Sequence, residues 1–301
     1  MKTLNHEVTV KQRYSAAAQA PESALCCPIE YPPDLLKAIP PEVLEKDYGC
    51  GDPSRYLKAG ETVLDLGSGG GKICFVAAQI VGPRGKVIGI DMTDEMLEVA
   101  RRNAPLVAER LGYANVEFRK GRIQDLALDL ELLERALKDR PATDAASFVA
   151  AEAWAAGLRV RQPLVPSASI DVVVSNCVLN LVEPSSKPRL FEEVFRVLRR
   201  GGRAVISDIV SNEPVSERMQ NDPELWSGCI SGALTEAGFL EAFAQAGFSA
   251  IQILKRAEQP WRTVQGLEFR SLTVQAFKEG QASGQESTAA SPQCCTAGNC
   301  C

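Results

Sequence analysis

Thiols are the residues with the clearest chemical use in this 301-residue chain, which contains ten cysteines and a single histidine. The histidine, His6, lies in a polar N-terminal stretch, which argues against a histidine-based zinc site and against a nucleophile activated by histidine. We expect the thiols to be reduced, and reduced thiols in this number indicate soft-metal binding, redox chemistry or simple burial. Chemistry at these cysteines must therefore rely on sulfur alone.

Three cysteines occupy positions that a ligand could reach. Cys50 lies in a loop with glycines and a proline at 48–53, and Cys229 lies in a glycine-interrupted segment that we expect to be a loop or a helix entry. Because both are flanked by glycine, we expect neither to be buried as a hydrophobic residue. Cys177 follows an apolar strand predicted at 170–176, at the edge where parallel sheets bind ligands. Three converging thiols would suit a soft acceptor, but their spacing leaves convergence open.

The other cysteines fall into three groups. Cys74 lies among apolar residues in the first turn of a predicted helix, and we expect it to pack in the core. Cys26 and Cys27 precede a proline-rich segment at 28–41. The last four belong to a tail of small and polar residues that we interpret as flexible and dispensable: Cys294, Cys295, Cys300 and Cys301.

A glycine-rich run indicates a cofactor site. Apolar residues at 63–66 predict a buried strand that includes Asp65, and the run that follows turns the chain into a helix near Lys72. Glycines let the backbone approach a ligand closely, with the N–H groups of the helix pointing at it. A second strand at 86–90 ends in Asp91, which is placed to accept from ribose hydroxyls. The residues that we assign to this site are Asp65, Gly67, Ser68, Gly69, Gly71 and Asp91.

The details of the run favour a cofactor with a cationic amino group. A dinucleotide site would show G-x-G-x-x-G, whereas the run here is D-x-G-x-G-G-G, with Asp65 just before the turn. The run resembles the first motif of class I S-adenosylmethionine-dependent methyltransferases, and Asp91-Met92 resembles the second. The segment 121–125 resembles the next motif. The resemblance implies that Met92 packs on adenine and that Ile123 and Gln124 close over it.

Further motifs together resemble arsenite methyltransferases. They are Y-G-C-G at 48–51, the run from Asp65 to Cys74, Asp91-Met92-Thr93, S-N-C-V-L-N-L-V at 175–182, the segment 225–234 and the paired cysteines of the tail. The resemblance covers 45–125 and 168–250. An ordinary class I methyltransferase has no reason to carry Y-G-C-G, S-N-C-V-x-N-L and L-W-x-x-C together.

This resemblance implies the substrate and the role of each thiol. Arsenite or methylarsenite would be held as a thiolate complex by Cys177 and Cys229, with Cys50 as the third sulfur in the first round, and methylated for arsenic detoxification. The pentavalent product would then be reduced as Cys50 forms a disulfide with Cys26 or Cys27. Thioredoxin or glutathione would restore the thiols. Arsenic keeps its lone pair in trigonal sulfur coordination, so no general base is needed.

Asn176, next to Cys177, has two interpretations. It orients the methyl donor or the donor's backbone contacts, or it only ends the strand as a turn residue. Two other functions also stay open for the whole chain. One is a methyltransferase for an organic small molecule with structural thiols, and the other is a non-catalytic, thiol-rich metalloid-binding protein.

Composition and apolar periodicity define the expected architecture. A hydrophobic content of 45% supports one large core plus a smaller unit, and a net charge of −5 does not favour nucleic acid as a partner. We find no apolar run near 18 residues and no cationic-then-apolar leader, so we expect no membrane partner and a cytoplasmic location. A helix is predicted at 191–198, ended by R-R-G-G at 199–202, and a strand follows at 204–209.

We therefore predict an α/β fold with a doubly wound, Rossmann-like class I methyltransferase sheet. An N-terminal arm (1–47) precedes the S-adenosylmethionine-binding domain (48–210), which contains an inserted helical hairpin at about 126–165. A small C-terminal arsenic-binding unit (211–280) presents Cys229 over the edge of the sheet, and a cysteine-containing tail (281–301) follows.

Overall fold

A computed structural model describes residues 5–20, 22, 31–46 and 48–279 of the chain. A central sheet forms its core, with the strand order β3-β2-β1-β4-β5-β9-β7. The first five strands of this path pair in parallel, and β9 pairs antiparallel with both β5 and β7. The strands are β1 Thr62–Leu66, β2 Lys86–Asp91, β3 Val116–Lys120, β4 Ile170–Asn176, β5 Leu198–Ser211, β6 Leu234–Thr235, β7 Ser249–Arg256, β8 Arg262–Val264 and β9 Leu267–Phe277.

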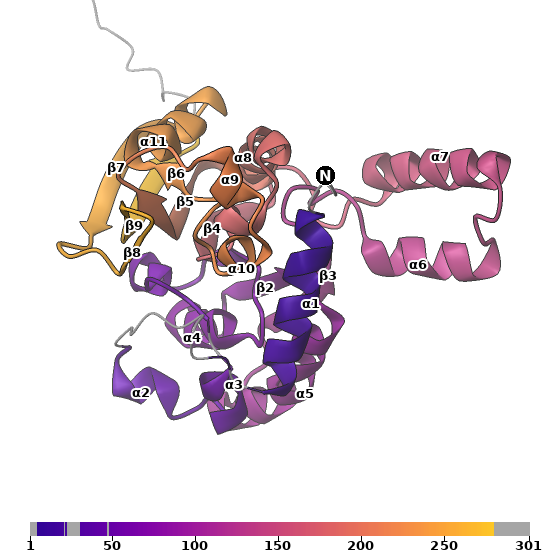
Figure 1. Cartoon of the computed structure of the whole chain (residues 1–301). Helices are drawn as coiled ribbons and strands as arrows, with labels where there is room; N and C mark the ends of the chain where they lie inside the picture. Colours follow the sequence, from indigo (N-terminus) through magenta and orange to yellow (C-terminus); the bar gives the residue numbers. More distant parts are fainter. Residues whose placement is uncertain (1–4, 21, 23–30, 47, 280–301) are drawn as a thin grey trace, which may run out of the picture.

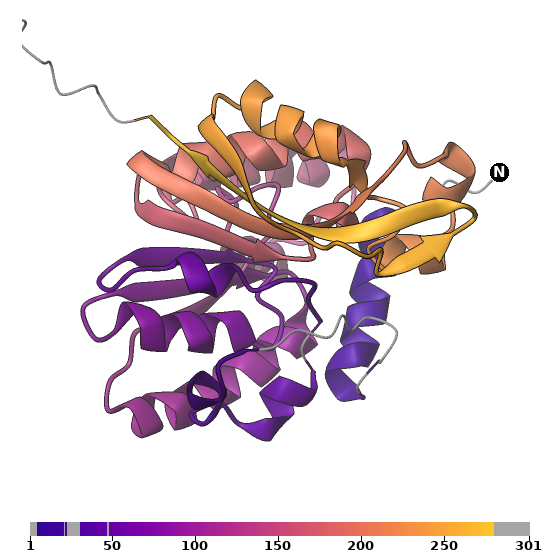
Figure 2. The same cartoon turned by 90° about the vertical axis from the view of Figure 1, so that its left-hand side faces the viewer.

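Helices cover both faces of this sheet, which confirms the doubly wound α/β fold. Successive strand residues alternate between two cores: Val63 and Val87 belong to the core under α4 and α5, and Leu64 and Ile88 to the core under α8 and α11. In Figure 2 the sheet runs between the purple helices and the pink and orange helices. The helices are α1 His6–Gln19, α2 Pro33–Leu36, α3 Pro41–Glu45, α4 Lys72–Val81, α5 Asp94–Leu111, α6 Leu130–Asp139, α7 Ala145–Arg161, α8 Lys187–Val197, α9 Glu217–Gln220, α10 Pro223–Ser227 and α11 Glu236–Gln245, with short 3-10 helices η2 Pro53–Tyr56, η3 Leu179–Leu181 and η4 Pro184–Ser186.

The sheet is mixed because the chain after β5 returns to it. The segment after residue 211 contributes β7, β8 and β9, and β9 pairs with β5 along nine residues, from Arg203 to Ser211. The loops that carry α9 and α10 leave this region at the carboxyl end of β5 and lie beside α1 (Figure 1). The C-terminal segment thereby extends the sheet and also brings Cys229 to its ligand-binding edge.

The inserted hairpin is present as predicted. Helices α6 and α7 lie side by side and project from the body of the molecule (Figure 1). Its base is closed by hydrogen bonds from Leu164 N–H to Ala127 O at 3.1 Å and from Val165 N–H to Leu126 O at 2.8 Å. Apolar side chains on α7, such as Val149 and Val160, are exposed.

The boundaries near residue 200 differ from those predicted. Helix α8 begins at Lys187, before the predicted start at 191, and β5 begins at Leu198, where a turn was expected. The register of β5 with β4 shifts between the pairs Ile170–Leu198 and Val172–Arg203. Extra residues of β5 therefore bulge out of the pairing, which is how R-R-G-G remains inside the strand.

Candidate active site

A cavity of about 660 Å³ lies at the carboxyl ends of β1, β2 and β4. The chain order of the sheet reverses between β1 and β4, and such switch points are where doubly wound sheets bind ligands. Nine of the predicted donor-site residues line the cavity: Asp65, Gly67, Ser68, Gly69, Asp91, Met92, Ile123, Gln124 and Asn176. Nothing among the described helices is both long and apolar enough to cross a membrane.

The glycine loop is held against β2 by its own backbone. The N–H groups of Gly67 and Ser68 donate to Ile90 O at 2.8 and 2.9 Å. Gly71 caps the N-terminus of α4 with φ at 94°, and a Cβ added there would lie 2.7 Å from the Phe118 ring. Gly71 is thus required by the turn and by packing, while Gly67, Ser68 and Gly69 face the cavity.

Two carboxylates border the cavity. The Asp91 carboxylate accepts from Gly69 N–H at 2.9 Å and from Thr93 N–H at 2.8 Å, so it shapes the loop that it faces. Burial raises the pKa of Asp91, and these N–H groups oppose that effect. Asp65 is 2% exposed and accepts from the Cys74 thiol at 3.2 Å. Cys74 is fully buried, as predicted.

The cavity fits a nucleoside that carries a cationic amino group. The Ser68 hydroxyl is buried against it with no hydrogen-bond partner among the described residues, so a ligand can supply one. A Cβ built on Gly69 meets nothing within 4 Å, which leaves room beside the loop. The two carboxylates supply acceptors for hydroxyls and for an ammonium group, and Met92 and Ile123 supply apolar wall.

Two arginines of this cavity were missed from the sequence. Arg159 of α7 donates to both carboxylate oxygens of Asp125, through Nη2 at 2.8 Å and Nε at 2.9 Å to Oδ2 and through Nε at 3.3 Å to Oδ1. Arg189 of α8 pairs with the same carboxylate at 3.0 Å. Asp125 is 3% exposed and directly follows Ile123 and Gln124, so the two arginines fix that loop. Arg159 is 34 residues from Asp125 in the chain, and no local pattern marks it.

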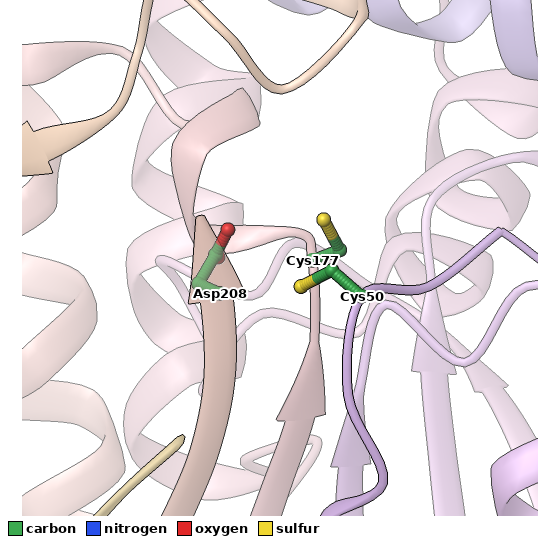
Figure 3. A group of neighbouring side chains, drawn as sticks. All are labelled: Cys50, Cys177 and Asp208. Carbon is green, nitrogen blue, oxygen red and sulfur yellow. The ribbon is translucent and has the colours of Figure 1, made fainter. Parts of the chain in front are cut away.

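Three cysteines, Cys50, Cys177 and Cys229, lie in one apolar cluster beside the cavity. The sulfurs of Cys50 and Cys177 and a carboxylate oxygen of Asp208 all lie within 4.8 Å of one another (Figure 3). The thiols of Cys50 and Cys229 both influence the pKa of the Cys177 thiol, so all three lie near one another. The Cys229 thiol also donates to Cys177 O at 2.9 Å. The fold therefore brings together three cysteines that are 127 and 52 residues apart in the chain.

All three cysteines are buried, with exposures of 6% for Cys50, 7% for Cys177 and 4% for Cys229. The expectation that Cys50 and Cys229 escape burial was wrong, because the loops that carry them pack into an apolar cluster with Ile230 and Phe269. Cys229 lies in the turn that leaves α10, so it follows a helix and does not enter one. The three thiols thus lie in an apolar cluster that shields them from water.

The backbone is strained at two of these thiols. Cys177 and Cys229 have φ values of 64° and 60°, in the left-handed region that side chains other than glycine rarely adopt. Such a conformation costs on the order of 1–3 kcal/mol and persists where surrounding contacts over-determine it. Here the Cys177 N–H donates to Ser207 O at 2.8 Å and the Cys229 N–H to Trp226 O at 3.1 Å. In this conformation the Cys229 thiol is directed at the backbone carbonyl of Cys177.

The thiols of Cys177 and Cys229 keep their protons at neutral pH. For Cys177 the contact with Cys229 lowers the pKa, but the hydrogen bond with Cys50, burial and the nearby Asp208 carboxylate raise it well above its ordinary value. The pKa of Cys229 is also raised well above its ordinary value, by its hydrogen bond with Cys177, by burial and by Asp208. A ligand that binds here must therefore displace thiol protons.

Asp208 and Lys187 are buried charged groups near the thiols, and each influences the pKa of the other. Burial raises the pKa of Asp208 to about 6 and lowers that of Lys187 to about 8. The Asp208 carboxylate accepts from Leu179 N–H at 2.8 Å and Ile209 N–H at 2.7 Å, and Lys187 donates to Leu179 O at 2.7 Å. Sequence reasoning missed Asp208, although a carboxylate near the carboxyl end of a predicted buried strand was a usable signal.

Two predictions about the N-terminal arm have different outcomes. His6 was assigned to a polar stretch, yet its ring lies on Trp226 with 3.9 Å between centroids, and it lines the cavity. The apolar residues of α1 show little helical periodicity, so the sequence did not predict that this helix packs against α5 and α10. Cys26 and Cys27, assigned to a disulfide relay, lie outside the described residues, as do the tail cysteines.

Comparison with known proteins agrees with this geometry. A family model described as a methyltransferase domain matches residues 57–257. An arsenite methyltransferase of Halobacterium salinarum is 40% identical over 212 residues, which are 70% of this chain and 43% of that protein. The arsenite methyltransferase of Homo sapiens is 30% identical over 256 residues, which are 82% of this chain and 59% of that protein. The chain thus matches about half the length of these curated relatives.

A solved structure is also similar. The crystal structure of CrArsM, an arsenic (III) S-adenosylmethionine methyltransferase from Chlamydomonas reinhardtii, has a TM-score of 0.63 and 29% identity, covering 87% of this chain and 76% of that chain. The sheet order, the cavity at the switch point and the family match over more than half of the chain lead to one conclusion. This chain belongs to the methyltransferase domain family and has its α/β fold.

Proposed function

We propose that this protein methylates trivalent arsenic, arsenite or methylarsenite, with S-adenosylmethionine as the methyl donor. The observation that carries the proposal is that three buried cysteines lie in one cluster beside the cavity, where the sulfurs of Cys50 and Cys177 are within 4.8 Å of one another. Three sulfurs match the trigonal coordination and the softness of trivalent arsenic. The similarity to proteins named arsenite methyltransferases supports the same substrate.

The proposed donor residues are those that line the cavity. Asp91 would accept from the ribose hydroxyls, Asp65 would balance the amino group, and Ser68 would use its free hydroxyl. Ile123 and Met92 would pack on the adenine. When bound, the donor supplies a sulfonium methyl group, which arsenic takes through its lone pair in an in-line displacement that leaves S-adenosylhomocysteine.

The proposed acceptor residues are Cys50, Cys177 and Cys229. Each thiol would give its proton to a hydroxide of arsenite, which leaves as water as one As–S bond forms. Arsenite would form three As–S bonds, whereas methylarsenite, with two hydroxides, would form two, with Cys177 and Cys229. These bonds hold arsenic and direct its lone pair, so positioning replaces a general base. Well-oriented reactants can recover about 7–11 kcal/mol of a barrier in favourable cases. Asn176 holds Cys50 in this arrangement.

We also propose how protein thiols reduce the methylated arsenic and are then restored. Methylation leaves arsenic pentavalent, and two thiols would return it to the trivalent state as they oxidise to a disulfide, for which we propose Cys50 with Cys26 or Cys27. Thioredoxin or glutathione would reduce that disulfide by exchange. Detoxification of arsenic in a cytoplasmic, reducing compartment is part of the same proposal.

The test is transfer of labelled methyl from S-adenosylmethionine to As(III) in the presence of glutathione. Wild type should yield labelled methylarsenic, and Cys177→Ser and Cys229→Ser should each lose it while still binding S-adenosylmethionine. Cys74→Ala serves as the thiol control for arsenic binding, because its sulfur faces Asp65 and not the cluster. Donor binding by wild type without any arsenic-dependent transfer would refute the proposal and favour an organic acceptor.

A further inference from the structure

Helix α1 connects both halves of the site. On the donor side Ser15 donates to Glu95 of α5 at 2.8 Å, and Glu7 pairs with Arg122 of the cavity wall at 2.6 Å. On the acceptor side the helix packs against α10, whose C-terminal turn carries Cys229 (Figure 1). The helix therefore spans the boundary between the cavity and the thiols.

Arg13 fastens this helix to the segment that carries Cys229. Its Nη1 donates to Glu224 O at 2.9 Å and to the Ser227 hydroxyl at 3.0 Å, while its other guanidinium nitrogens bond to Glu22. Ser227 is only two residues before Cys229. The position of α1 thus sets the position of the last turn of α10.

Tyr14, the next residue, lies between the two half-sites. It lines the cavity, its ring meets that of Tyr48 edge-on at 6.1 Å, and its hydroxyl lies 3.9 Å from the Cys229 sulfur. The single thiol proton of Cys229 is donated to Cys177 O, so the Tyr14 hydroxyl is the donor and the sulfur accepts. Burial raises the pKa of Tyr14 well above its ordinary value, which keeps that proton in place.

We propose that Tyr14 is a positioning residue of the acceptor site: its hydroxyl occupies one lone pair of the Cys229 sulfur and turns the S–H bond toward Cys177, where arsenic would replace the proton. This inference rests on the proposed function, since it names a residue that prepares the same three thiols. Tyr48 helps to hold helix α1 in this position, because its hydroxyl donates to Ala17 O of the helix at 3.0 Å. Tyr48 begins the loop at 48–53 that carries Cys50, and Tyr14 contacts the Cys229 sulfur. Helix α1 thereby joins these two residues.

The test uses full-length wild type, Tyr14→Phe and Tyr14→Ala, with Gln12→Ala as the control on the exposed side of the same helix. Two probes are titrated: As(III), and phenylarsine oxide, a trivalent arsenical that binds paired thiols whether or not the protein methylates arsenic. Binding of S-adenosylmethionine is measured by calorimetry on every variant. Tyr14→Phe keeps the ring and its packing and removes only the hydroxyl.

We expect Tyr14→Phe to weaken both arsenical affinities by about two- to tenfold, the range for one neutral hydrogen bond, with donor affinity changed less than about twofold. Tyr14→Ala should weaken them further, and Gln12→Ala should match wild type. Arsenical affinity in Tyr14→Phe equal to that of wild type would overturn the inference. Failure of the proposed function looks different: wild type would bind phenylarsine oxide and yield no methylarsenic.

Discussion

The side-chain amide of Asn176 holds Cys50 beside Cys177. Its Oδ1 accepts from the N–H groups of Cys50 at 2.9 Å and Gly51 at 3.0 Å, and its Nδ2 donates to Gly51 O at 2.8 Å. Asn176, the residue before Cys177, therefore fixes the loop that carries Cys50. The end of strand β4 thus positions two of the three sulfurs: Cys177 directly follows the strand, and its last residue, Asn176, holds the loop of Cys50.

Asn176→Ala should release the Cys50 loop. Removing the amide takes the acceptor from the N–H groups of Cys50 and Gly51, at a cost of about 1–3 kcal/mol in unfolding free energy, while Gly51 O keeps its bond from the Tyr31 hydroxyl. X-ray absorption of the arsenic-loaded variant should then show two sulfur ligands to arsenic, where wild type shows three. Asn176→Asp, which keeps an oxygen that can accept from both N–H groups and loses only the donor to Gly51 O, is the matched control and should retain the third sulfur. Three sulfurs in the alanine variant would show that Cys50 needs no such support.

Arsenite binding should exchange no net protons with the buffer near neutral pH. The raised pKa values of Cys177 and Cys229 keep these thiols protonated, and each proton leaves as water with a hydroxide of arsenite. Calorimetric binding enthalpies measured at pH 7 in two buffers of different ionisation enthalpy should therefore agree. If the thiols were thiolates, binding would take up protons and the two enthalpies would differ.

Asp208 should make stability fall as pH rises through the acidic range. Its pKa is raised from 3.8 to about 6, so the folded state holds the proton more tightly, and this stabilisation is complete below pH 3.8 and lost as pH rises through about 6. At about 1.4 kcal/mol per pKa unit, the full effect is about 3 kcal/mol. Lys187, with a pKa of about 8, is protonated throughout this window.

Urea denaturation at pH 4.5 and pH 7 tests this effect. The unfolding free energy of wild type minus that of Asp208→Asn should be larger at pH 4.5 than at pH 7. An unchanged difference would mean that the carboxylate is ionised in the folded protein at both pH values.

Arg159→Ala should weaken donor binding although it lies in the inserted hairpin. Its bidentate bonds to Asp125 brace the loop of Ile123 and Gln124, and Arg189 alone would remain on that carboxylate. We expect S-adenosylmethionine affinity to fall by about tenfold, or about 1.4 kcal/mol, near the low end for a hydrogen bond to a charged group. Arg161→Ala, an exposed change on the same helix, should leave affinity unchanged in the same calorimetric titration. Equal affinities in the two variants would make the hairpin a surface elaboration.

Local patterns in the sequence were enough to predict which residues of the glycine run and of the end of β2 line the cavity. Strand β1, the glycine turn and strand β2 form one continuous segment, so the order of Asp65, Gly67 and Asp91 along the chain already determines their neighbourhood in a parallel sheet. The helical hairpin could be predicted for the same reason, since its apolar spacing lies within one segment.

The acceptor half was decided by tertiary structure. Cys50 and Cys229 lie in loops with no periodic pattern, and only the packing of those loops against β5 and β9 determines that they are buried. The contacts of Asn176, Tyr14 and Arg159 join residues 34 or more positions apart, and such pairings arise when separate segments share a core. Residue types along the chain thus specified sulfur chemistry and a cofactor fold, while the three-dimensional packing alone specified which sulfurs meet and which side chains hold them.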